Sequence, residues 1–67
     1  MKFKDFAKEH ADDKVDIVTV FVNDTITTQT DTLLSEHLIE YDNLEVVDHE
    51  IDYDTDNGIL YLDIYCR

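Results

Sequence analysis

The dipeptide Asn57-Gly58 constrains the fold of this chain more than any other feature of its sequence. It separates two runs, residues 44–56 and 59–66, in which apolar and polar residues largely alternate. Asn-Gly between alternating runs is the strongest short-range signal for a β-hairpin, because both residues tolerate the positive φ angles of a type I′ turn. The sequence therefore predicts a hairpin close to the C-terminus.

A two-residue turn fixes the register of this hairpin and so decides which side chains lie opposite each other. The register places Asp56 opposite Ile59 and, further from the turn, Asp52 opposite Asp63. One face of the predicted hairpin is apolar and is expected to face the core: His49, Ile51, Tyr53, Leu60, Leu62, Ile64 and Cys66. The other face is acidic and carries two tyrosines: Asp48, Glu50, Asp52, Asp54, Asp56, Tyr61, Asp63 and Tyr65.

This acidic face is the strongest functional signal in the sequence. Acidic residues occupy every second position from Asp48 to Asp56, and no Lys lies near them in the sequence. Like charges directly opposite each other destabilise a sheet. Alternate residues along a strand are about 6.6–6.8 Å apart, similar in scale to DNA, with one phosphate per about 3.4 Å of axis on each strand. The face therefore predicts a surface for a basic cleft, and the alternative is an exposed sheet face that serves solubility.

Upstream of the hairpin the sequence predicts a helix, two strands and a second short helix. Apolar residues recur at helical spacing in residues 3–11. Residues 15–22 are rich in β-branched residues and apolar on both faces, which favours a central strand or one that meets a partner. Asn23-Asp24 fits a hairpin turn, followed by a Thr-rich edge strand at 25–32, for which low complexity is the alternative. A helical face in residues 33–41 predicts one short helix or helical turn.

These elements combine into an α+β fold, in which an N-terminal helix packs on a small, mostly antiparallel sheet of about four strands. At 67 residues the chain is expected to form a single small acidic domain, residues 1–67. A domain of about 60 residues buries only about 60% of its unfolded surface, so its core is thin. Binding to a second copy of the chain or to a larger partner is therefore an alternative to a stable monomer.

The charge of the chain limits the partners it can have. Seventeen acidic residues against five basic ones give a net charge of −12. The four lysines and four acids in residues 1–14 balance, so the net charge belongs to residues 15–67, where Arg67 is the only base. Direct binding of nucleic acid through a basic surface is excluded, because phosphate contacts need clustered Lys and Arg. An anionic membrane surface is disfavoured for the same reason.

The sequence favours a cytoplasmic protein that is not an enzyme. It has no apolar run near the ~20 residues of a membrane-spanning helix, and its charged start does not resemble a signal peptide. Ser35 and His37 would share one short helix, which is the wrong geometry for a catalytic triad. Three histidines and the single Cys66 match no zinc spacing. No metal and no cofactor are therefore expected.

Calcium remains as a minor alternative. Residues 52–63 resemble an EF-hand loop, with acids at loop positions one, three, five and twelve. The glycine, however, is Gly58 at position seven instead of six, and position twelve is Asp63 instead of the longer Glu. A regular hairpin would also point these carboxylates away from one face, without wrapping them around an ion.

The sequence resembles a group of small proteins from phages and mobile elements of Gram-positive bacteria. The resemblance lies in the opening Met1-Lys-Phe-Lys-Asp-Phe-Ala-Lys, in Asp12-Asp13 with the Val- and Ile-rich strand that follows, and in residues 56–60. Such small acidic proteins include anti-CRISPR and anti-restriction inhibitors, several of which are DNA mimics that occupy the site where a nuclease binds DNA. The resemblance assigns no contact residues, so the acidic face comes from the strand register alone.

The resemblance implies a non-enzymatic inhibitor in a bacterial host cell. Its partner would be a basic nucleic-acid-binding protein, either a CRISPR nuclease or a restriction enzyme, bound through the acidic face. The alternative is a structural or regulatory interaction module of a phage or mobile element, without DNA mimicry. Such a module could be a homodimer that uses Ile17, Phe21 and the edge of the Thr-rich strand.

Overall fold

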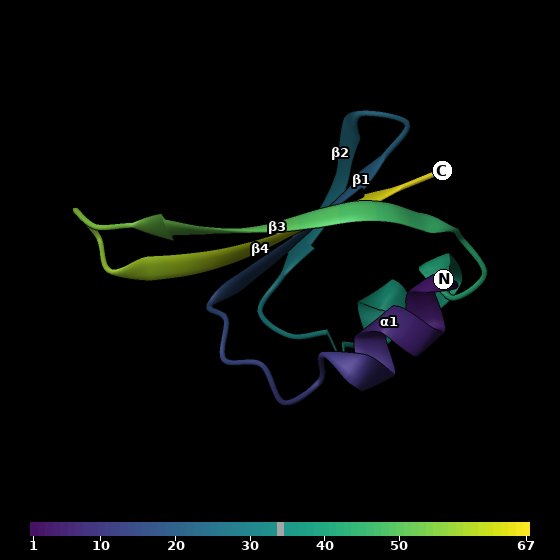
Figure 1. The fold of residues 1–67 in the computed structure, drawn as a ribbon, viewed down its shortest axis with the longest axis horizontal. Helices are drawn as coiled ribbons and strands as arrows, with labels where there is room; N and C mark the ends of the chain where they lie inside the picture. The colour runs from purple at the N-terminus through teal and green to yellow at the C-terminus, as the bar shows by residue number, and fades with distance from the viewer. Residues whose placement is uncertain (34) are drawn as a thin grey trace.

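A four-stranded sheet with two short helices on one side forms the described part of the chain, residues 1–33 and 35–67, in this computed structural model (Figure 1). The elements in chain order are α1 (Phe3–Glu9), β1 (Ile17–Val22), β2 (Thr25–Thr30), the 3₁₀-helix η1 (Glu36–Tyr41), β3 (Val46–Asp54) and β4 (Ile59–Cys66). The strand order is β2-β1-β4-β3. The two hairpin pairs are antiparallel and the central pair, β1 and β4, is parallel. The predicted α+β fold is confirmed.

The first hairpin follows its predicted turn. Asn23 and Asp24 have φ angles of 52° and 67°, which are the left-handed values that a type I′ turn requires. β2 is an edge strand, as the Thr-rich composition predicted. η1 starts later than the predicted helix, after Ser35, whose side chain accepts a hydrogen bond from the His37 N–H at 3.2 Å. Residue 34 of that predicted segment lies outside the described residues.

The start of α1 is held in place by residues 44–46, which lead into the edge strand β3. The helix has no side-chain cap at its start. Instead, the Met1 amino group pairs with Glu45 Oε1 at 2.6 Å. The N–H groups of Phe3 and Val46 donate to the carbonyls of Leu44 and Met1, each at 2.8 Å. No helix in residues 1–33 and 35–67 is long and apolar enough to cross a membrane.

The core lies between the two helices and one face of the sheet. Val18 and Val20 of β1 and Ile64 of β4 are fully buried. The rings of Phe3 and Tyr41 lie 6.2 Å apart and connect α1 to η1. The buried apolar residues are Phe3, Phe6, Ala7, Val18, Val20, Leu33, Leu38, Tyr41, Leu62, Ile64 and Cys66.

The second hairpin differs from the prediction by two residues in register. β3 ends at Asp54, opposite Ile59, so residues 55–58 form a four-residue loop in place of the two-residue turn. The Asp54 carboxylate accepts hydrogen bonds from the N–H groups of Asp56 and Asn57, and from the Asn57 side chain at 2.8 Å. Gly58, with a φ of 65°, donates to the Asp54 carbonyl at 2.8 Å. These four bonds to one residue favour the longer loop over a type I′ turn.

The register shift changes which residues face each other but not which face they lie on. A shift of one residue would exchange the two faces, whereas a shift of two preserves them. Asp52 therefore lies opposite Tyr61, and not opposite Asp63 as predicted. Glu50 lies opposite Asp63 instead. Asp56 leaves the strand for the loop.

The predicted apolar face of the hairpin is buried only in part. Leu62, Ile64 and Cys66 of β4 belong to the core, but Ile51 and Tyr53 of β3 are 57% and 56% exposed. His49 is exposed as well. The cause is the length of the strands: nine residues of β3 extend about 30 Å, whereas seven residues of α1 extend about 10 Å. The outer half of the hairpin therefore projects beyond the helices (Figure 1).

Candidate functional site

The candidate site is the side of the sheet opposite α1 and η1, here called the open face. No helix or strand of the described residues covers this side of the sheet (Figure 1). Strand pairing arranges its side chains in three rows across β1, β4 and β3. The rows are Ile17, Tyr61 and Asp52; Thr19, Asp63 and Glu50; and Phe21, Tyr65 and Asp48.

A polar row crosses the centre of the open face from one edge strand to the other. Gln29 of β2 donates from Nε2 to Thr19 Oγ1 at 3.1 Å. Thr19 is 2% exposed, and its side chain also hydrogen-bonds the Asp63 carboxylate. Glu50 of β3 faces Asp63 in the register. The centre of the face therefore holds two carboxylates side by side, with the Thr19 hydroxyl at Asp63 and the Tyr65 hydroxyl at Glu50.

The pKa of Asp63 is raised above its usual value. Partial burial is the main cause, and the negative charges of Glu50 and Asp52 add to it. The hydrogen bond with Thr19 lowers the pKa but does not cancel the other two effects. Asp63 thus lies where a further positive charge would be most favourable.

Tyr65 joins the acidic row to an aromatic pair. Its hydroxyl donates to Glu50 Oε1 at 2.6 Å, and its ring stacks on Phe21 with the centroids 4.8 Å apart. The hydrogen bond to Glu50, together with burial and the charges of Glu50, Asp63 and Asp48, raises the pKa of Tyr65 to about 12. Tyr65 therefore keeps its proton at physiological pH and remains a hydrogen-bond donor.

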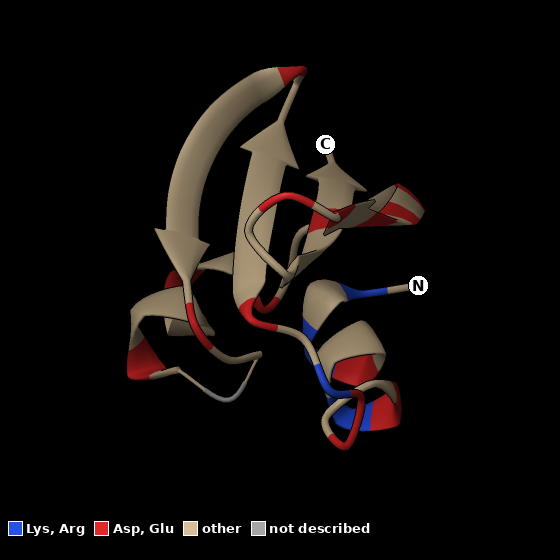
Figure 2. Cartoon of the chain, turned by 90° about the vertical axis from the view of Figure 1, so that its left-hand side faces the viewer, with Lys and Arg blue, Asp and Glu red and all other residues tan. Residues whose placement is uncertain are grey.

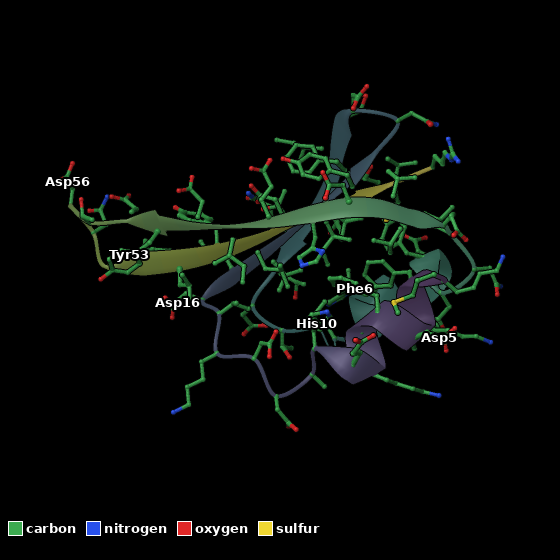
Figure 3. The ribbon with its side chains drawn as sticks, viewed as in Figure 1. Asp5, Phe6, His10, Asp16, Tyr53 and Asp56 are labelled. Carbon is green, nitrogen blue, oxygen red and sulfur yellow. The ribbon has the colours of Figure 1, made fainter. Side chains whose placement is uncertain are left out.

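The predicted site residues separate into two groups in the structure. Six of them share the open face: Asp48, Glu50, Asp52, Tyr61, Asp63 and Tyr65. Asp54 instead closes the hairpin loop, and its hydrogen bonds with Asn57 and Asp56 hold the pKa of its carboxyl below the usual value. Asp56 lies in the loop at the tip of the hairpin (Figure 3).

Sequence reasoning missed the contribution of β1 and β2 to this face. Thr19, Phe21 and Gln29 reach it because β1 pairs in parallel with β4, some forty residues later in the chain. The signal that was available is the apolar character of both faces of residues 15–22. That pattern correctly favoured a central strand, but it did not identify the neighbouring strand.

Metal binding and thiol chemistry find little support in the described residues. Within residues 1–33 and 35–67 no group of three or more His, Cys, Asp or Glu side chains is arranged to hold a metal ion. The Asp54 carboxylate, which the calcium alternative needs, accepts the N–H bonds of its own loop. Cys66 is buried, and burial raises the pKa of its thiol.

Comparison of the chain with protein-family models, with curated proteins and with solved structures found no match.

Proposed function

We propose that this protein is a non-enzymatic inhibitor of a host defence nuclease, either a CRISPR effector or a restriction enzyme, in the cytoplasm of a bacterial host. Its open face binds the basic cleft in which the nuclease holds nucleic acid, and it competes with DNA for that cleft. The observation that carries the proposal is the pair of opposed carboxylates, Glu50 and Asp63, at the centre of an uncovered sheet.

Charge repulsion on the open face is not relieved within the chain. Residues 15–66 contain no Lys or Arg. The ion pairs found in the part of the chain that the structure describes, Met1 with Glu45 and His10 with Asp13, lie away from the face. A guanidinium group from a partner can bind two carboxylate oxygens at once in charge-assisted hydrogen bonds. The face therefore favours a cationic partner over water.

The aromatic residues of the open face supply packing contacts that a purely charged surface would lack. Tyr61, Tyr65 and Phe21 lie next to the carboxylates and are half-buried. Aromatic side chains near the centre of an interface often account for much of its affinity. The more exposed acids of β3 would mainly increase the association rate and its dependence on salt.

Charge reversal on the open face is the direct test. We would measure DNA cleavage by a panel of purified CRISPR effectors and restriction enzymes in the presence of this protein. Wild type is expected to inhibit one of them, and excess DNA is expected to relieve the inhibition. The double variant Asp48→Lys/Asp52→Lys should weaken inhibition by at least roughly tenfold, equivalent to about 1.4 kcal/mol.

A matched control keeps the change in net charge the same. The variant Glu9→Lys/Asp12→Lys replaces two exposed acids, the last residue of α1 and one in the turn that follows it, where Lys also suits the helix dipole. It should inhibit as wild type does. If both variants lost inhibition equally, net charge and not the open face would be responsible. If no nuclease were inhibited, the proposed function would be wrong.

The alternative is a homodimeric interaction module, and one observation favours it. β2 is an uncharged edge strand, and its Ile26 is 59% exposed. Unpaired edge strands are templates for pairing with another chain. Sedimentation at two protein concentrations separates the two functions, because the proposed inhibitor is a monomer at both and the module is a dimer at the higher one.

A further inference from the structure

β3 has a neighbouring strand on one side only. It is the last strand in the order β2-β1-β4-β3, and no strand of the described residues lies against its other side. All its residues except the first and the last are exposed. The N–H of His49 is bonded to Asp48 Oδ1 at 2.8 Å, and residues 50–54, which follow, are here called the outer edge. An exposed edge of this kind can pair with a strand from another chain.

The backbone of the outer edge directs hydrogen-bonding groups away from the sheet. Leu60 of β4 donates its N–H to the Asp16 carboxylate and accepts the Asp16 N–H at its carbonyl, each at 2.8 Å on the β1 side. Leu60 therefore does not bond to Tyr53, which it faces in the register. Bonded and non-bonded pairs alternate along an antiparallel ladder. Tyr53 and, two residues earlier, Ile51 therefore point their N–H and C=O groups outward.

The same side of the chain already binds an extended cationic segment just before β3 begins. Residues 1–3 run antiparallel to residues 44–46, with Lys2 opposite Glu45. The hydrogen bond with the Met1 amino group lowers the pKa of the Glu45 carboxyl, and the charge of Lys2 adds to this effect. The molecule therefore contains its own example of a basic strand added beside an acid.

The side chains of β3 determine which strand can pair with the outer edge. Glu50 and Asp52 lie on the open face, and Ile51 and Tyr53, both more than half exposed, lie on the helix side. Opposite charges on neighbouring strands stabilise a sheet, and like charges directly opposite each other destabilise it. A strand that complements the outer edge therefore carries Lys or Arg at alternate positions, with apolar residues between them.

A second copy of this chain does not meet this requirement. Antiparallel pairing of two β3 strands would bring Glu50 and Asp52 beside the same acids of the other copy. The β2 edge of another copy is uncharged and offers no cation. Residues 15–66 contain no Lys or Arg, so the strands of this chain cannot supply the alternating pattern. The occupant is therefore a segment of a different protein.

We propose that the outer edge of β3 binds an extended segment of a partner protein as an added antiparallel strand, in which Lys or Arg alternates with apolar residues. The cations lie beside Glu50 and Asp52, and the apolar side chains lie beside Ile51 and Tyr53. The direction is that of residues 1–3, which pair antiparallel on the same side of the chain. The proposal rests on the proposed function for one point, that the partner is the inhibited nuclease.

Peptides that differ only in backbone N-methylation test the pairing. In an added antiparallel strand of alternating Lys and Val, the Val N–H groups point to β3 and the Lys N–H groups point away. Each peptide is titrated into ¹⁵N-labelled protein and followed by NMR. The unmethylated peptide and the peptide methylated at its Lys backbone nitrogens should bind alike. Methylation at the Val nitrogens should weaken binding at least roughly tenfold, equivalent to about 1.4 kcal/mol.

Hydrogen exchange adds a readout at the outer edge itself. The Ile51 and Tyr53 amides should exchange more slowly when the unmethylated peptide is bound, because a paired N–H is protected. Equal effects of the two methylations would overturn the proposal, as would a loss of binding on methylation at Lys instead of Val. Slower exchange of these amides on concentrating the free protein would show that a second copy covers the edge, and would also overturn it.

Charge reversal tests the choice of a basic strand. The variant Glu50→Lys/Asp52→Lys should bind the unmethylated peptide at least roughly tenfold more weakly than wild type, again about 1.4 kcal/mol. The control Glu9→Lys/Asp12→Lys changes the net charge equally and should bind as wild type does. Equal binding by wild type and Glu50→Lys/Asp52→Lys would show that the acids of β3 do not select the strand, and the proposal would be wrong.

The nuclease assay distinguishes failure of this proposal from failure of the proposed function. If Asp48→Lys/Asp52→Lys abolishes inhibition but the two methylated peptides bind alike, the open face is correct and the added strand is not. If methylation at Val alone weakens binding and the unmethylated peptide relieves inhibition, both proposals are supported. If no nuclease is inhibited but the methylation pattern holds, the outer edge pairs with a basic strand of another protein and only the proposed function fails.

Discussion

Asp63 is the residue at which burial, hydrogen bonding and charge compete on the open face. Burial and the neighbouring charges of Glu50 and Asp52 raise its pKa, so the folded protein holds this proton more tightly than the unfolded chain does. The free energy of unfolding therefore decreases as pH rises from the unfolded pKa through the raised folded value. Above the raised folded value the ionised carboxylate destabilises the fold to its full extent.

Replacing Asp63 with Asn should stabilise the protein at pH 7. The amide removes the repulsion from Glu50 and can still hydrogen-bond Thr19, so we expect a gain of about 0.2–1 kcal/mol, the range for a cross-strand pair. Thermal unfolding at pH 7 and at about pH 3 measures this gain. The lower pH lies below the pKa of about 3.9 that Asp has in an unfolded chain. The gain should disappear at the lower pH, and Asp52→Asn should give less because Asp52 faces Tyr61. A loss of stability at pH 7 would contradict this account.

The sequence predicted a turn correctly where one local signal determines it, and incorrectly where two local signals compete. Asn23-Asp24 had no competitor, and its turn formed as expected. Asn57-Gly58 competed with the Asp54 carboxylate, whose hydrogen bonds select a longer loop. The acidic face survived this error because the register shifted by two residues. The parallel pairing of β1 with β4 could not be predicted, because nothing local links strands so far apart in the sequence.

α1 is an element that tertiary contacts maintain, and Phe6 provides the clearest test. Phe6 is 3% exposed and lies against the His10 and His49 rings, with centroids at 4.3 and 5.1 Å. A buried Phe→Ala change costs about 3–5 kcal/mol, whereas a chain of this length is stable by only about 3–10 kcal/mol. Circular dichroism should therefore show Phe6→Ala unfolded or strongly destabilised at 25 °C.

Phe21→Ala is the matched control for that prediction. Phe21 is half-buried on the open face and stacks on Tyr65. Its removal should leave the protein folded, since an aromatic pair contributes about 0.5–1.5 kcal/mol beyond the area it buries. The variant should nevertheless weaken inhibition of the nuclease. Equal stability of the two variants would mean that α1 does not close the core.

At the scale of the whole molecule, charge and shape act together. The chain measures 35 × 24 × 18 Å along its principal axes, and a net charge of −12 lies within that volume. Figure 2 shows Lys at the N-terminal end and around α1, while acidic residues also mark the loops and strands of the sheet. The excess negative charge repels itself in the folded state and attracts a basic partner. Both effects depend on the distance over which charges interact in solution.

Salt should therefore change stability and binding in opposite directions. The Debye length falls from about 30 Å at 0.01 M to about 3 Å at 1 M salt, from nearly the length of the molecule to the spacing of adjacent groups. Screening the self-repulsion of the folded chain should raise the thermal unfolding temperature across this range. The affinity for the inhibited nuclease should fall over the same range, because its Lys and Arg residues are screened from the open face. Calorimetry and a binding titration in the same buffers measure both trends. Affinity that stays constant while the unfolding temperature rises would show that the charge of the open face does not contribute to binding.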